Sequence, residues 1–134
     1  MIESYSDGAG KNSSGKGAAS FLIVKDKTII HQEAFLLKDK TNNEAEYIAL
    51  YNAIDYLCKE GYDTFTCYVD SELIYKQVIG EYRVNVPELL HWNNKIADLW
   101  YVQGRNITFK WVPRTNVLIK QADAMNKRIM RYHE

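Results

Sequence analysis

The sequence has few of the features that mark secreted, disulfide-stabilised or membrane proteins. Only two of its 134 residues are cysteine, Cys58 and Cys67, and they have neither metal-ligand spacing nor a disulfide-rich context. No apolar run is long enough to cross a bilayer, and no basic segment followed by an apolar one marks a signal peptide. We therefore expect a cytoplasmic chain that does not contact a membrane, with both cysteines reduced and in the core.

The chain also has no net charge, because seventeen basic residues balance seventeen acidic ones. Net charge alone is therefore not expected to drive tight nucleic-acid binding, although a local basic face is compatible with this balance. Internal repeats, low-complexity tracts and long linkers are absent as well. With 46% hydrophobic and 25% charged residues, the chain is predicted to be one domain over residues 1–134. No obligate protein partner is indicated, so we expect a monomer.

Extended and helical segments alternate along the chain. Apolar patterning predicts strands over residues 2–7, 18–24, 28–37, 64–69 and 106–112, the second and third forming a hairpin. A capping box at Thr41 and Glu44 predicts a helix that stops near Gly61. Further helices are expected over 71–79, from Pro87 onward and after the last strand. Strands joined by helical crossovers are typical of a partly parallel sheet, so we predict an α/β domain.

Apolar residues at helical spacing indicate which helix faces are buried. The first long helix is predicted to bury Ala45, Ala49, Ala53 and Leu57. In the helix from Pro87, the inward residues are predicted to be Leu90, Ile96 or Ala97, and Trp100. In the last helix, the predicted stripe is Leu118, Ala122, Met125 and Ile129.

Four acidic residues fall where such elements converge. Asp7 and Asp70 each directly follow or end a predicted strand. If those strands are parallel neighbours, both carboxylates lie at the sheet edge where ligands bind in open α/β domains. Glu46 and Asp123 lie in the first turn or two of helices that could aim at the same edge. Each acid alone has a plainer interpretation: a turn residue, a solvated group, a helix cap or a favourable charge near a helix N-terminus.

Four carboxylates that meet in one place repel each other, and a divalent cation relieves that repulsion. Oxygen ligands without histidine or cysteine favour Mg²⁺ or Mn²⁺ over zinc. Two such ions roughly 3.5–4 Å apart are the usual arrangement for hydrolysis of a phosphodiester, one activating water and the other stabilising the leaving oxygen. All four acids fall where one such site could be built, and this coincidence favours a chemical role over four separate structural ones.

Four stretches resemble the signatures of type 1 ribonuclease H. They are Ser6-Asp7-Gly8-Ala9, Thr41-Asn42-Asn43-Glu44-Ala45-Glu46-Tyr47, Tyr68-Val69-Asp70-Ser71 and Ala122-Asp123. They follow the order and spacing of that family over nearly the whole chain; the second and third are specific, and Ala122-Asp123 is weak alone. The resemblance implies a ribonuclease H-like fold, with a five-stranded mixed sheet flanked by helices.

The same resemblance implies an activity and a set of site residues. It implies Mg²⁺-dependent cleavage of the RNA strand of RNA–DNA hybrids, leaving 5′-phosphate and 3′-hydroxyl ends. The residues implied to be catalytic and to bind two Mg²⁺ ions, for which Mn²⁺ could substitute, are Asp7, Glu46, Asp70 and Asp123. Glu44 occupies a variable position of the motif, in agreement with a capping role.

Recognition of RNA requires small donors and acceptors that can sense the 2′-hydroxyl close to the backbone. Gly8, Asn42 and Asn43 could supply them, although the asparagines could also be only turn residues. Thr41 is a candidate contact to DNA phosphates, and Ser71 could contact either strand or simply cap its helix. Backbone contacts of this kind position a duplex without reading bases, so we expect little sequence preference.

The chain also departs from the family. The loop after the last strand, Val112-Pro113-Arg114-Thr115-Asn116, lacks the histidine that many members carry and resembles the archaeal-like branch, with Arg114 as a candidate phosphate contact. Ile119 stands where an asparagine often precedes the last acid. The histidines, His31, His91 and His133, are expected on the surface or in packing.

These departures leave two alternatives open. One is a catalytically weak or inactive ribonuclease H-like module that binds nucleic acid. The other is a nuclease of the same fold that acts on a different nucleic acid.

Overall fold

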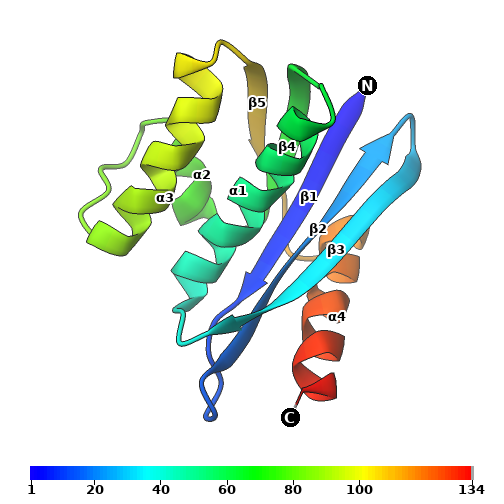
Figure 1. The fold of residues 1–134 in the computed structure, drawn as a ribbon, viewed down its shortest axis with the longest axis vertical. Coiled ribbons are helices and arrows are strands. Elements are labelled where there is room, and N and C mark those ends of the chain that lie inside the picture. Colours follow the sequence, from blue (N-terminus) through cyan, green and yellow to red (C-terminus); the bar gives the residue numbers. More distant parts are fainter. Residues whose placement is uncertain (134) are drawn as a thin grey trace.

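A computed structural model, which describes residues 1–133, shows a five-stranded mixed sheet with helices on both faces (Figure 1). The strands are β1 (Ile2–Ala9), β2 (Lys16–Lys25), β3 (Thr28–Lys38), β4 (Thr64–Val69) and β5 (Asn106–Trp111), in the spatial order β3-β2-β1-β4-β5. The helices are α1 (Asn42–Lys59), α2 (Glu72–Val78), α3 (Pro87–Ala97) with its π-helical extension η1 (Asp98–Val102), and α4 (Val117–Tyr132). The predicted fold class and order of elements are confirmed.

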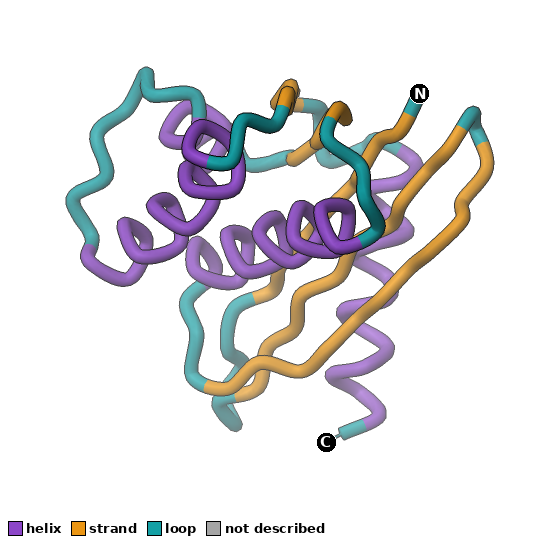
Figure 2. Tube along the Cα trace, turned by 45° about the horizontal axis from the view of Figure 1, so that its top comes forward, coloured by secondary structure: helices purple, strands orange, loops and turns teal. Residues whose placement is uncertain are grey.

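The sheet separates two helical layers. Figures 1 and 2 show α1 and α3 on one face of the sheet and α4 on the other. The side chains of β2 alternate accordingly: Phe21 belongs to the core under α1, whereas Leu22 packs with Ile119 of α4. A strand covered on both faces needs apolar residues at successive positions, which explains the continuous run through β2.

The central strand β1 connects the antiparallel and parallel halves of the sheet. It pairs antiparallel with β2 along its whole length and parallel with β4 over Glu3–Tyr5. Because β1 and β4 run in the same direction, Asp7 and Asp70 lie at the same edge of the sheet. The condition under which both acids share one edge, that these two strands are parallel neighbours, is therefore met.

The start of α1 is fixed by two local features. The Thr41 hydroxyl accepts a hydrogen bond from the Glu44 N–H (3.1 Å) and the Glu44 carboxylate accepts one from the Thr41 N–H (3.2 Å), so the capping box is confirmed. A Cβ at Gly8 would lie 2.2 Å from the main-chain carbon of Ala45. Glycine there lets β1 approach the backbone of α1 and brings Glu46 to the end of the strand.

Two predicted helix faces are corrected by the structure. In α3 the predicted Ile96 is buried, and Trp100 of η1 packs partly buried against the core. Leu89, however, is buried in place of the predicted Leu90, which is 42% exposed. In α4 the fully buried stripe is Ile119, Ala122 and Asn126, and the predicted residues other than Ala122 flank it, only partly buried. Helix α4 is rotated by about one residue from its most apolar pattern, whereas α3 keeps Ile96 inward and differs at Leu89 alone. In α4 this rotation places an asparagine against the sheet.

The expectation that both cysteines are reduced core residues is met in part. Cys67 is buried in β4 and Cys58 is half-buried, and both are free thiols. Among residues 1–133, no helix combines the length and apolar character that a membrane span requires.

Candidate active site

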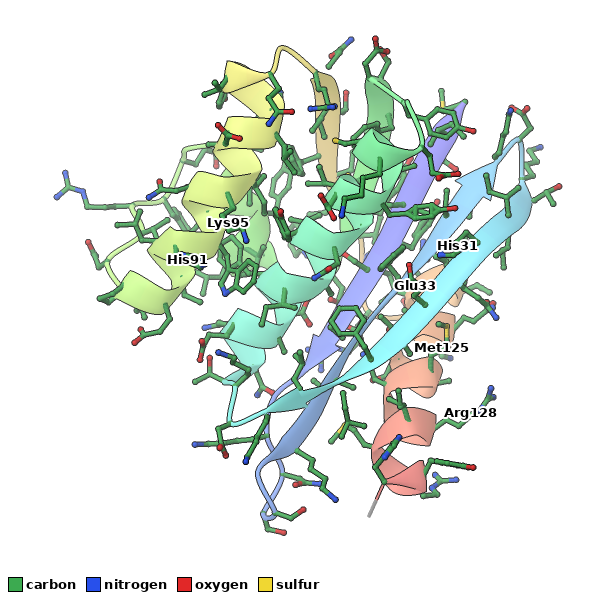
Figure 3. All side chains as sticks on the ribbon, in the orientation of Figure 1. His31, Glu33, His91, Lys95, Met125 and Arg128 are labelled. Atoms are coloured by element: carbon green, nitrogen blue, oxygen red, sulfur yellow. The ribbon has the colours of Figure 1, made fainter. Side chains whose placement is uncertain are left out.

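Three carboxylates meet where β1 and β4 end. Asp7 lies near the end of β1, Glu46 in the second turn of α1, and Asp70 directly after β4. Each offers one oxygen, and these three oxygens all lie within 4.8 Å of one another. The three acids line a hollow of about 830 Å³. A second hollow, between β3 and α4, has a volume of about 310 Å³, and its lining includes Met125 and Arg128, which Figure 3 labels.

The environment of these acids disfavours their charged forms. Burial raises the pKa of Asp7 to about 7, and the charges of Asp70 and Asp123 act in the same direction. Burial also raises the pKa of Glu46 well above its ordinary value, and the charges of Asp7 and Asp70 add to this effect. The Gly8 N–H donates to Oε1 of Glu46 (3.2 Å) and partly offsets the rise. Acids held together at such a cost are typical of a functional site.

Asp123 lies beside the cluster of three rather than within it. It lines the same hollow and raises the pKa of Asp7, but it is not one of the residues whose oxygens meet within 4.8 Å. Its carboxylate pairs with the Lys127 ammonium one turn further along α4, at 2.9 Å. The structure therefore gathers the four predicted acids into one hollow, with three of them in direct proximity.

The predicted substrate-binding residues are divided between this hollow and the fold. Those that line the hollow are Gly8, Asn42, Asn43, Ser71 and Arg114, whereas Thr41 is not among its lining residues. The Asn42 side-chain oxygen accepts from the Gly10 N–H (2.8 Å), and the Ser71 hydroxyl caps α2 by accepting from the Ile74 N–H (3.2 Å). The plainer structural interpretation of Asn42 and Ser71 is thus present in the structure.

Arg114 is placed differently from the other candidates. Its side chain is 91% exposed, and its Nε lies 3.4 Å from an oxygen of Asp70, whose side chain is only 4% exposed. The Trp111 indole donates to the Asp70 carbonyl (3.2 Å) and joins the end of β5 to the same segment. The guanidinium therefore reaches the rim of the hollow and keeps most of its donors free for another group.

The structure adds residues that sequence patterns did not single out. Lys120 and Lys127 bring positive charge to the hollow from α4. The Asp123–Lys127 spacing of four residues was a visible signal for a helical ion pair. Asn126 donates to Asp7 from the buried face of α4, and a polar residue on an otherwise apolar stripe was its only sequence signal.

No histidine lines the hollow among residues 1–133. His31 lies on β3 and stacks on Tyr56 at 4.0 Å between ring centroids, and His91 lies on α3 against Trp92 (Figure 3). His133 is exposed at the end of α4. The prediction that the histidines serve packing or the surface is confirmed.

The sequence is similar to a known protein family and to curated proteins of two organisms. A family model described as reverse transcriptase-like matches residues 5–128. Ribonuclease HI of Halobacterium salinarum is 33% identical over 89 residues, which cover 66% of this chain and 45% of that protein. A bifunctional protein of Mycobacterium tuberculosis is 28% identical over 110 residues, which cover 81% of this chain and 30% of that protein. The chain spans less than half the length of these curated relatives.

Solved structures match over almost the whole domain. The crystal structure of RNase H1 from Halobacterium salinarum superposes with a TM-score of 0.88 at 28% identity, covering 98% of both chains. An RNase H1 isolated from compost, solved in complex with an RNA/DNA hybrid, gives 0.87 at 29% identity and covers both chains completely. The chain is similar in sequence and fold to type 1 ribonucleases H, and it belongs to the reverse transcriptase-like family.

Proposed function

We propose that this chain is an endonuclease that hydrolyses the RNA strand of RNA–DNA hybrids with two divalent ions, Mg²⁺ or in its place Mn²⁺. One observation carries the proposal: oxygens of Asp7, Glu46 and Asp70 lie within 4.8 Å of one another at the end of two parallel strands. The similar compost RNase H1 was solved with an RNA/DNA hybrid, which supports this choice of substrate.

The donor set fits a hard divalent cation. All donors of the cluster are carboxylate oxygens, and burial and mutual repulsion raise the pKa values of Asp7 and Glu46, a cost that a bound cation would relieve. Asp7, Glu46 and Asp70 would hold the ions, with Asp123 completing the set from α4. Bound there, divalent cations would lower the pKa of an attacking water and stabilise charge on the departing oxygen.

The chain's own groups would orient the substrate for this reaction. Attack of water on phosphorus would break the P–O3′ bond. The phosphate would stay on the 5′ oxygen of one product, and the departing 3′ oxygen would take up a proton to become the 3′-hydroxyl of the other. Asn42 and Asn43, which line the α1 side of the hollow, would contact the RNA strand, and the N–H of Gly8 donates to Glu46. Thr41, which caps α1 outside the hollow, would contact the DNA strand, and Ser71 either strand.

A comparison of four labelled substrates tests the proposal. With Mg²⁺ or Mn²⁺, the purified chain should cut the RNA strand of a hybrid internally and leave double-stranded RNA and double-stranded DNA intact. Single-stranded RNA should also survive, because the second strand is needed to position the scissile phosphate. Preferential cutting of another duplex would identify a different nuclease of this fold.

A binding module without catalysis is the second candidate. Two departures of the sequence favour it: the loop 112–116 contains no histidine, and Ile119 stands before Asp123 in place of an asparagine. Titration of the hybrid in a chelator measures binding separately from cleavage. Hybrid binding followed by no cleavage in either metal would support the module. Chromatography of the same sample tests the further expectation of a monomer.

Arg114→Ala is expected to weaken hybrid binding without affecting the fold. A 91% exposed arginine with one long ion pair contributes little to stability. If the guanidinium contacts a phosphate, its loss should raise KM for the hybrid several-fold at all sequences and reduce the slope of log affinity against log salt by about 1. Arg114→Lys is the matched control, because it keeps the charge. An unchanged salt slope in Arg114→Ala would contradict the phosphate contact.

A further inference from the structure

Asn126 is a fully buried polar residue in the middle of the α4 stripe that packs on the sheet. Its exposed fraction is 0%, the same as those of Ile119 and Ala122, which precede it on that stripe. Its side-chain Nδ2 lies 3.1 Å from the main-chain oxygen of Asp7 and 3.3 Å from Oδ2 of the same residue. One amide group thus donates to both the backbone and the carboxylate of Asp7.

The orientation of this amide follows from chemistry. Both atoms of Asp7 that it contacts are oxygens, which accept hydrogen bonds, so the NH₂ group and not the carbonyl must face them. The pairing of β1 with β4 ends at Tyr5, two residues before Asp7. Asn126 therefore supports Asp7 at the point where the sheet ladder to β4 has stopped.

This arrangement is not what stability alone would select. Oδ1 of Asn126 is buried and has no hydrogen-bond partner among the described residues 1–133. A buried acceptor left unsatisfied destabilises the fold, whereas an apolar side chain of similar size would continue the stripe. The residue at this position thus combines a structural cost with a direct contact to a site carboxylate.

A second contact holds the same helix on the other side of Asp123. The Ser20 hydroxyl, fully buried on β2, donates to the Ala122 carbonyl at 2.7 Å. This bond ties α4 to the sheet but does not touch a site carboxylate. Ser20 therefore offers a control in which the helix–sheet contact is weakened and the amide of Asn126 is kept.

We propose that Asn126 is a positioning residue that fixes the carboxylate of Asp7 beside Glu46 and Asp70 for binding of divalent ions. The inference rests on the proposed function, because it assumes that Asp7 is a metal ligand. Groups that hold a ligand from behind typically contribute 10–100-fold to metal affinity or activity. The effect of such a residue on metal binding can be distinguished from its effect on stability. Replacing the amide removes the contact to Asp7, but it also removes a buried acceptor that destabilises the fold.

The test measures ion binding without substrate. The electron paramagnetic resonance signal of free Mn²⁺ reports its dissociation constant for wild type, Asn126→Leu and Ser20→Ala. We expect the constant to rise 10–100-fold in Asn126→Leu, with a Tm in chelator at or above that of wild type. Ser20→Ala should lower the Tm and change the Mn²⁺ constant by less than about twofold. In cleavage assays, high Mg²⁺ should restore the rate of Asn126→Leu while KM for the hybrid stays unchanged.

The outcomes distinguish the two levels of the proposal. An Mn²⁺ constant in Asn126→Leu equal to that of wild type, in a wild type that binds Mn²⁺ and cleaves hybrids, overturns the positioning role alone. A wild type that neither binds Mn²⁺ nor cleaves overturns the proposed function and this inference with it. Should Asn126→Leu fail to fold, Asn126→Ala removes the same amide without adding bulk, and the same constants decide.

Discussion

Asp70→Asn should lose nearly all hybrid cleavage while the protein stays folded. Asp70 belongs to the cluster of three oxygens, so its replacement removes a direct metal ligand. We expect kcat to fall by at least ~10³-fold, more than the 10–100-fold typical for loss of a group behind a ligand. The fold should persist, because the change removes a charge that repels the buried Asp7.

The measurement is single-turnover cleavage of a labelled hybrid in saturating Mg²⁺, together with a thermal melt. Asp26→Asn is the matched control: it makes the same substitution at an exposed position in the β2–β3 turn, at the opposite end of β1 from Asp7. The control should cleave at the wild-type rate. A rate in Asp70→Asn within tenfold of wild type would rule out the proposed role of this carboxylate.

Asp7→Asn should stabilise the metal-free protein at neutral and alkaline pH but not at acidic pH. The pKa of Asp7 is about 7 in the folded chain, against an ordinary value of 3.8 that applies when unfolded. The folded state therefore prefers the protonated carboxyl, and stability present below about pH 4 is lost as the pH rises through about 7. This difference in pKa corresponds to roughly 2–4 kcal/mol of stability at pH 8.

Urea unfolding in chelator at a series of pH values measures this effect. The free energy of unfolding of wild type should decline between about pH 4 and pH 7, and the curve of Asp7→Asn should be flatter and lie above it at pH 8. Asp26→Asn should follow wild type closely at pH 7–8. Added Mg²⁺ should stabilise wild type more than Asp7→Asn. Parallel curves for wild type and Asp7→Asn at all pH values would contradict the raised pKa.

Much of the site could be predicted because its acids occupy positions that local rules define. Asp7 and Asp70 follow strands whose ends are visible in the alternation of apolar residues, and the structure makes those two strands the parallel neighbours that a shared site requires. Glu46 follows a capping box, so its position in the second turn of α1 was fixed as soon as Thr41 was identified.

The buried faces of α3 and α4 could not be predicted, because the apolar residues of each helix are compatible with more than one rotation about its axis. In α4, Leu118, Met125 and Ile129 make an apolar stripe that looks as convincing as the one actually buried. The face that is buried includes Asn126, which donates to Asp7. The same ambiguity explains the exchange of Leu89 for Leu90 in α3. The ion pair of Asp123 with Lys127, which holds that acid beside the cluster, is likewise a property of side-chain conformation.

Anomalous scattering from a crystal soaked in Mn²⁺ tests the central claim most directly. The account predicts manganese peaks in the hollow, bonded to oxygens of Asp7, Glu46 and Asp70, with Asp123 released from Lys127 to complete the site. Manganese bound elsewhere on the chain, with these carboxylates free of it at saturating concentration, would contradict the account.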